Sequence, residues 1–177
     1  MRTITITAGH STTDPGAVNG IFKEADIAQD MRNMCAHYLR AAGVPIRTDG
    51  EGKGNAPLSK AIELIKGSAI AVEFHCNAAT SKKAEGTEAL ASEKHRLISQ
   101  KLCKAINEVT GIPLRGAQGW KPENSGQHSR LGYVRGGGII LELFFISNDD
   151  ELKIWQDKKW LIAKAVSQVL IDEAKAA

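Results

Sequence analysis

Short apolar segments alternate along the chain with amphipathic helical segments, and this alternation constrains the fold more than any other feature. Strands are expected at residues 3–7, 44–47, 68–74, 86–91 and 138–146. Helices are expected from Glu24 to a stop at Gly43, and at residues 57–66, 94–109 and 159–174. Strands that alternate with helices form βαβ units. The sequence therefore predicts an α/β fold with a mostly parallel central sheet and helices on both faces.

The length and the cysteine content suit one compact domain. The 177 residues are enough to bury a core without disulfide bonds, so we expect a single domain that spans residues 1–177. Cys35, Cys76 and Cys103 are odd in number and form no Cys-x-x-Cys pair. They are predicted to be free thiols. The first strand alternates Thr and Ile at residues 3–7, which predicts that it is half-buried.

The charge balance and hydropathy bear on possible partners. The chain has 23 Lys and Arg against 20 Asp and Glu, a formal net charge of +3. This balance argues against nucleic-acid binding, which usually needs a strongly basic surface. It mildly favours an anionic polymer such as a bacterial cell wall, although a small excess of surface Lys explains it equally well. No apolar run approaches the ~20 residues of a membrane span, so membrane insertion is not expected.

Two histidines follow directly on predicted strands. His10 comes after the first strand, and His75 comes after the apolar run at residues 69–74. If the two strands are neighbours, both imidazoles lie at one edge of the sheet, where ligands bind in open α/β folds. Two imidazoles and a carboxylate can bind a catalytic Zn²⁺, and Glu24 at the start of a helix could supply the carboxylate. Equally, the histidines could be hydrogen-bonded loop residues, and Glu24 could stabilise the helix dipole.

Glu142 is the most anomalous residue, because it lies inside the apolar run at residues 139–146. A carboxylate in a central strand is costly to bury unless it is paired, protonated or close to a cation. An edge strand with Glu142 facing water is the alternative, but the apolar residues around it argue against that. Near a metal ion, Glu142 could act as a general base that takes a proton from water.

The remaining candidates carry weaker signals. Glu73 lies two residues before His75 on the same strand, so it could orient a metal-binding histidine or form an ordinary ion pair. His37 and His95 have no partners in the pattern and are interpreted as structural. His128 lies in the loop before the last strand and could contact substrate.

Four motifs follow one another along the chain. They are Gly9-His10 with Asp14-Pro15-Gly16-Ala17 and Lys23-Glu24, then His75-Cys76-Asn77-Ala78, then Gly86-Thr87-Glu88, and then Glu142 with Phe145-Ile146-Ser147-Asn148. In this order they resemble the motifs of the N-acetylmuramoyl-L-alanine amidases of the Amidase_3 family, which occur as bacterial amidases and phage endolysins. Each motif is weak alone, but their order and spacing cover nearly the whole chain. The chain departs from the family at Ser11, where a second Gly is usual, at the bulky Leu143-Phe144, and over residues 120–138.

The resemblance implies His10, Glu24 and His75 as ligands of a Zn²⁺ cofactor and Glu142 as the catalytic carboxylate. It assigns no catalytic role to Glu88. It implies hydrolysis of the amide bond between N-acetylmuramic acid and L-alanine in peptidoglycan. Two alternatives stay open: a zinc peptidase that cuts within the stem peptide, and a wall-binding module without catalysis.

The expected biology follows from the same resemblance. The pattern of the N-terminal residues is typical of a strand and not of a signal peptide. We therefore expect a phage endolysin that accumulates in the host cytoplasm as a monomer. It would be released through a holin to act on the cell wall in the periplasm and cause host cell lysis.

Overall fold

The computed structural model describes residues 1–125 and 131–176, so the prediction for His128 lies outside the described residues. A six-stranded sheet forms the centre of the molecule, in the order β4-β1-β5-β8-β6-β7. Its strands are β1 (Ile4–Ala8), β4 (Ile46–Thr48), β5 (Ile70–Asn77), β6 (Glu88–Leu90), β7 (Trp120–Lys121) and β8 (Ile139–Phe145). The helices are α1 (Glu24–Ala41), α2 (Leu58–Ile65), α3 (Arg96–Thr110), α4 (Gly132–Arg135) and α5 (Asp149–Lys175).

The sheet is mostly parallel, as predicted. β1 pairs in parallel with β4 and β5, and β5 pairs in parallel with β8. The exception is β6, which runs antiparallel to β8 while β7 runs parallel to β6. The carboxyl ends of β1, β5 and β8 therefore lie at one edge of the sheet, and polar residues that end these strands are brought together there.

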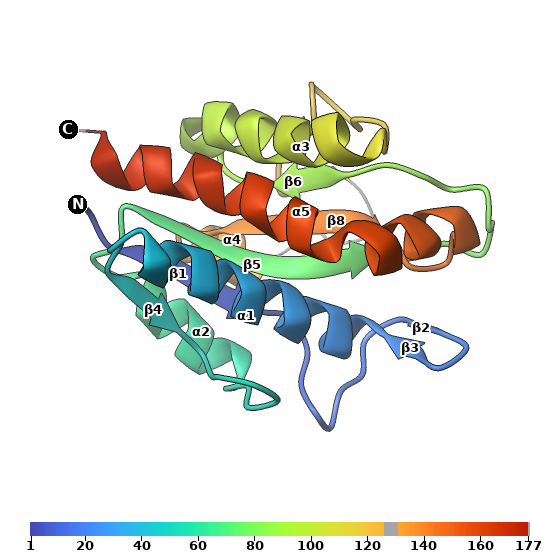
Figure 1. Cartoon of the computed structure of the whole chain (residues 1–177), viewed down its shortest axis with the longest axis horizontal. Coiled ribbons are helices and arrows are strands. Elements are labelled where there is room, and N and C mark those ends of the chain that lie inside the picture. Colours follow the sequence, from blue (N-terminus) through green and yellow to red (C-terminus); the bar gives the residue numbers. More distant parts are fainter. Residues whose placement is uncertain (126–130, 177) are drawn as a thin grey trace.

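Helices cover both faces of the sheet, which confirms the predicted layering. α1, α3 and α5 lie together on one face (Figure 1) and contribute to the main apolar core. A smaller apolar cluster on the other face is formed with α2 and α4 around Ala61, Tyr133 and Ile140. The three cysteines are buried and free, as expected. Among the described residues, no helix is long and apolar enough to cross a membrane.

The prediction that the first strand is half-buried is wrong, because all five residues of β1 are buried. This strand lies between β4 and β5 and is covered on both faces, so its threonines need internal hydrogen-bond partners. The Thr5 hydroxyl lies 3.0 Å from the Leu64 carbonyl oxygen and 2.6 Å from the Ser68 hydroxyl. These contacts tie the strand to the end of α2.

Several elements differ from the predicted boundaries. α5 begins at Asp149, ten residues before the expected position 159. Its start is stabilised by the Asn148 side chain, which accepts hydrogen bonds from the backbone N–H groups of Asp150 and Glu151. β7, α4 and the small hairpin of β2 (Val18–Asn19) and β3 (Phe22–Lys23) lie in segments for which neither a helix nor a strand was predicted. These elements are two to four residues long, too short for a periodic pattern to reveal.

Candidate metal centre

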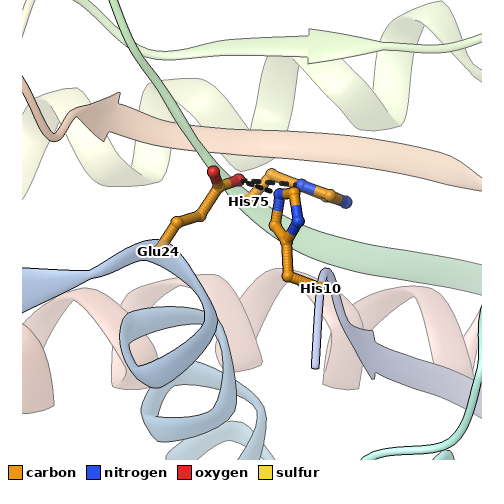
Figure 2. Close-up of side chains that lie close together, drawn as sticks. All are labelled: His10, Glu24 and His75. Atoms are coloured by element: carbon orange, nitrogen blue, oxygen red, sulfur yellow. Dashed lines mark hydrogen bonds and ion pairs between the residues drawn. The ribbon is translucent and has the colours of Figure 1, made fainter. Parts of the chain in front are cut away.

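His10, Glu24 and His75 meet at the carboxyl edge of the sheet (Figure 2). His10 lies two residues beyond β1, His75 lies near the end of the neighbouring β5, and Glu24 is the first residue of α1. Glu24 Oε1 is 3.0 Å from His10 Nε2 and 2.9 Å from His75 Nδ1. One donor atom from each residue lies within 4.8 Å of the others. The predicted proximity of the two strands is confirmed, and the three side chains form one cluster.

Two glycines make room for this cluster. A Cβ atom at Gly9 would lie 2.1 Å from His75 Cε1, so any larger residue there would clash with the imidazole ring. Gly16 has a φ of +65°, and a Cβ there would lie 2.6 Å from both Glu24 Oε2 and His10 Cδ2. The glycines of the Gly-His and Asp-Pro-Gly-Ala motifs are thus required by close approach and, at Gly16, by a left-handed backbone.

Each of the three residues of the cluster also contacts a residue outside it. Asp14 Oδ2 lies 3.0 Å from His10 Nδ1, and Glu73 Oε1 lies 3.1 Å from His75 Nε2. The buried Glu24 accepts hydrogen bonds from the backbone N–H groups of Ala17 and Cys76. These contacts fix the ring orientations, so that His10 Nε2 and His75 Nδ1 face Glu24. Such outer partners are typical of metal-binding histidines.

The charges of the cluster favour a bound cation. Burial raises the pKa of Glu24, but hydrogen bonds from His10 and His75 more than offset this and hold its pKa below the ordinary value. The hydrogen bond to Glu24 raises the pKa of His10. Burial lowers the pKa of His75, but hydrogen bonds to Glu24 and Glu73 raise it well above its ordinary value. Without a metal, protons on the imidazoles supply the positive charge that the carboxylates require. Two imidazoles and one carboxylate therefore fit a divalent cation that would replace those protons.

Glu142 stands directly beside the cluster. It is the register partner of His75 in the pairing of β5 with β8, and partners in register point to the same face of a sheet. Its Oε2 atom is shielded from solvent and has no hydrogen-bond partner among the described residues. Burial raises the pKa of Glu142 to about 7. β8 is a central strand, so the alternative of an edge strand facing water is wrong.

Within residues 1–125 and 131–176, Glu73 forms no ion pair with a lysine or arginine. In the described part of the chain its partners are His75 and the Thr7 hydroxyl, at 3.1 Å and 3.4 Å. It is buried, with 4% of its surface exposed. A buried carboxylate whose cationic partner is a histidine suits the orienting interpretation better than the ion-pair interpretation.

Several polar residues around the centre were not singled out from the sequence. Asp14 could have been noticed, because it lies four residues after His10 in a motif already quoted. Arg115 and Lys121 carry no signal in the sequence, since they lie in a segment interpreted as a loop. His37 is exposed and His95 is buried, and neither belongs to the histidine and carboxylate cluster found among the described residues.

A cavity of about 270 Å³ opens beside the cluster. It lies between the end of β1 and the start of α2, and Glu73 and His75 form part of its wall. The Asp14 carboxylate also lines it, and the side chains on the α2 side are small or apolar: Ala56, Pro57, Leu58 and Ala61. This cavity is large enough for part of a substrate next to the candidate metal position.

Comparison with known proteins agrees with this geometry. The sequence profile described as N-acetylmuramoyl-L-alanine amidase (Amidase_3) matches residues 4–172. The structure is similar to a proposed N-acetylmuramoyl-L-alanine amidase from Neisseria meningitidis. The two share 52% identity with a TM-score of 0.93, covering 99% of this chain and 97% of that one. No curated protein sequence matches the chain.

Two more distant structures share the fold. The amidase AmiC2 of Nostoc punctiforme is 16% identical with a TM-score of 0.84, covering 97% of this chain and 96% of that one. The catalytic domain of the amidase CwlV from Bacillus (Paenibacillus) polymyxa var. colistinus is 19% identical with a TM-score of 0.75. That match covers 98% of this chain and 96% of that one.

Proposed function

This chain belongs to the N-acetylmuramoyl-L-alanine amidase family, and from that membership we propose that it is a zinc-dependent peptidoglycan amidase. The bond cleaved is the amide between the lactyl carbonyl of N-acetylmuramic acid and the nitrogen of L-alanine. The observation that carries the proposal is the His10–Glu24–His75 cluster with the carboxylate of Glu142 beside it, whose buried Oε2 atom is unpaired among the described residues.

The donor set favours zinc among divalent cations. His10 Nε2, His75 Nδ1 and a Glu24 oxygen would hold the ion. Two imidazoles and one carboxylate are a known ligand set of catalytic zinc sites, which keep one position open. Magnesium and calcium prefer all-oxygen ligands and fit this set poorly. When bound, zinc would supply Lewis acidity that polarises the scissile carbonyl and makes water more acidic.

Glu142 is proposed as the general base. Its carboxylate would accept a proton from the attacking water and then deliver that proton to the departing nitrogen of L-alanine. A pKa of about 7 suits both steps, because the group can hold and release a proton near neutral pH. Its Oε2 atom has no hydrogen-bond partner in residues 1–125 and 131–176, so one acceptor is available for that proton.

Asp14 and Glu73 are proposed as positioning residues. Each contacts the imidazole nitrogen that faces away from Glu24. By accepting an N–H from that nitrogen, each carboxylate would keep the other nitrogen unprotonated and aimed at the metal.

The test is analysis of the products released from purified peptidoglycan, with zinc present and after chelation. Mass spectrometry should find free lactyl groups and intact stem peptides with zinc, and neither after chelation. Fragments cut within the stem peptide would instead indicate a zinc peptidase. Retention on the wall without any released product would indicate a binding module. In a parallel check, His75→Ala should lower the zinc content per chain, and unchanged zinc would remove His75 from the ligand set.

The biological role is proposed from the resemblance to the endolysins of this family. The chain would accumulate in the host cytoplasm as a monomer, pass through a holin and lyse the host by degrading its wall. A holin gene next to the coding sequence would support this role, and an isolated chromosomal locus would oppose it.

A further inference from the structure

A row of charged residues extends from the metal centre across one face of the sheet. His75, Glu142 and Glu88 are register partners on β5, β8 and β6, so their side chains share this face. Lys121 on β7 is paired with Leu90, two residues after Glu88, and therefore lies on the same face. Neighbouring strands are about 4.8 Å apart, so β7 lies about 10 Å from β8.

Two cations share one carboxylate at the far end of this row. Arg115 Nε and Lys121 Nζ each lie 2.7 Å from Glu88 Oε2. Asn77 Nδ2 donates to the other oxygen, Oε1, at 3.0 Å. Among the described residues, Glu88 is the one carboxylate paired with either cation, so a positive charge is left over. We call these two residues the Arg115–Lys121 pair.

The Arg115–Lys121 pair is held in place and yet reaches solvent. The Arg115 guanidinium lies 4.8 Å from the centre of the Phe145 ring and donates to the Glu85 carbonyl oxygen at 3.0 Å. The side chains of Arg115 and Lys121 remain 36% and 22% exposed. The ammonium group of Lys121 carries three N–H donors and the guanidinium five, more than the contacts to Glu88 and Glu85 use.

The opposite side of the metal centre has the reverse character. There the cavity beside His75 is lined by the carboxylates of Asp14 and Glu73 and by apolar side chains of the segment around Leu58. A negatively charged ligand group would be repelled on this side and attracted on the side of the Arg115–Lys121 pair. The centre is thus flanked by an acidic, apolar side and a basic side.

We propose that the Arg115–Lys121 pair binds a free carboxylate of the stem peptide, and so fixes the direction in which substrate crosses the centre. This rests on the proposed amidase function. In such a substrate the amidated muramic acid is uncharged, whereas the peptide is anionic. The first free carboxylate after the scissile bond is the α-carboxylate of the second residue, D-glutamate. The sugar then lies at the cavity beside α2, and the peptide runs over β6 towards β7.

The spacing agrees with this direction. An extended chain advances about 3.5 Å per residue, so the D-glutamate carboxylate lies about 4–7 Å beyond the scissile nitrogen. With the scissile bond at Glu142 on β8, this length places the D-glutamate carboxylate near β6. There Arg115 and Lys121 contact Glu88. Arg115 and Lys121 are therefore specificity-determining residues that act on substrate charge.

The experiment compares two muramyl tripeptides that differ at one group. One is N-acetylmuramoyl-L-alanyl-γ-D-glutamyl-L-lysine, and in the other the α-carboxylate of D-glutamate is amidated. Binding to the zinc-loaded Glu142→Gln variant is measured by calorimetry, and KM and kcat are measured with the unmutated enzyme. We expect about tenfold tighter binding of the free acid, because one charge-assisted contact is lost on amidation. Lys121→Met and Arg115→Gln should each reduce that preference by weakening binding of the free acid alone.

Matched variants separate recognition from a structural role. Lys121→Arg keeps the positive charge and should retain most of the preference for the free acid. Lys153→Met, which removes an exposed lysine on α5, should leave that preference unchanged. If the Lys121→Met and Arg115→Gln variants lose affinity for both tripeptides equally, the pair only stabilises Glu88 and the proposal is overturned. Equal binding of both tripeptides before any change to the pair also overturns it. Failure of the amidase proposal appears separately, as the absence of free lactyl groups in the product analysis.

Discussion

Each of the three residues of the metal centre, His10, Glu24 and His75, has at least one partner inside the cluster and at least one outside it. Glu24 contacts both imidazoles, while Asp14 and Glu73 hold the outer nitrogens. Glu142 departs from this pattern, since its Oε2 atom is buried and has no hydrogen-bond partner in the part of the chain that the structure describes. A buried polar atom left unpaired costs stability, and such a cost is typical of groups kept for function.

Replacing Glu142 tests its role as the base. Glu142→Gln keeps the shape of the side chain but cannot accept the proton, so turnover on peptidoglycan should fall by about 100- to 10,000-fold. Zinc content should not change, because Glu142 is not among the proposed ligands. The measurements are the release rate of muropeptides and elemental analysis of the purified variant. Clearing of a cell-wall suspension at the unmutated rate would refute the assignment.

Replacing Glu73 tests the support of His75. Glu73→Gln leaves an amide that can present its N–H group to Nε2 and so favour the wrong tautomer, which should weaken zinc affinity by about 10- to 100-fold. Competition with a chromogenic chelator measures that affinity directly. The control is Glu63→Gln, which removes an exposed carboxylate on α2 that is paired with Lys60. Equal zinc affinity in both variants would show that Glu73 has no positioning role.

At the scale of elements, a buried ion pair links α1 to the segment after β4. Arg32 and Asp49 are fully buried side chains that lie 3.1 Å apart. Asp49 also accepts the N–H group of Ala8 at the end of β1, and Asn55, itself bonded to Arg32, donates to the Ala8 and His10 carbonyl oxygens. This network holds the backbone from which His10 projects.

Breaking this ion pair should be costly. Arg32→Met removes the cation and leaves Asp49 buried without compensation, so the free energy of unfolding should fall by about 3–5 kcal/mol. Urea denaturation of the metal-free protein measures it. The double variant Arg32→Met with Asp49→Leu should recover part of the loss, because no uncompensated charge stays buried. A loss under about 1 kcal/mol in the single variant would mean that water reaches Asp49.

The elements themselves were predictable in proportion to their length. β1, β5, β8 and α1 carry long, regular patterns and occur where the sequence places them. The first ten residues of α5 were missed, although Asn148 followed by three acidic residues is a capping signal. No local pattern predicts the single turn of α4 or the two-residue β7, because contacts with distant segments stabilise both.

At the scale of the whole molecule, the centre couples pH to stability when no metal is bound. The folded pKa values of His10 and His75 are raised, and burial raises that of Glu142 from 4.5 to about 7. Between pH 6 and pH 9 the folded chain therefore binds more protons than the unfolded chain, and stability falls as pH rises. The lowered pKa of Glu24 acts in the opposite direction, but only in acid.

The expected outcome is a Tm of the chelated protein that decreases by several degrees from pH 6 to pH 9. Bound zinc requires neutral imidazoles, so the stabilisation that it adds should grow over the same range. Thermal unfolding at constant ionic strength, with chelator and with zinc, measures both effects. In the Glu142→Gln variant the decrease in Tm should be smaller, because that carboxyl group no longer titrates. A Tm of the chelated protein that is flat or rises with pH would contradict the charge assignment.

The sequence by itself determined the α/β class, the main strands and helices, and the placing of His10, Glu24, His75 and Glu142 at element ends or in an apolar strand. These features depend on local periodicity and on motifs of a few residues. Only the tertiary structure decided that β6 turns antiparallel, which nitrogen of each histidine faces Glu24, and that Arg115 and Lys121 meet beside Glu88. The physical reason is that these depend on pairing between segments far apart in the chain, whose register no local pattern encodes.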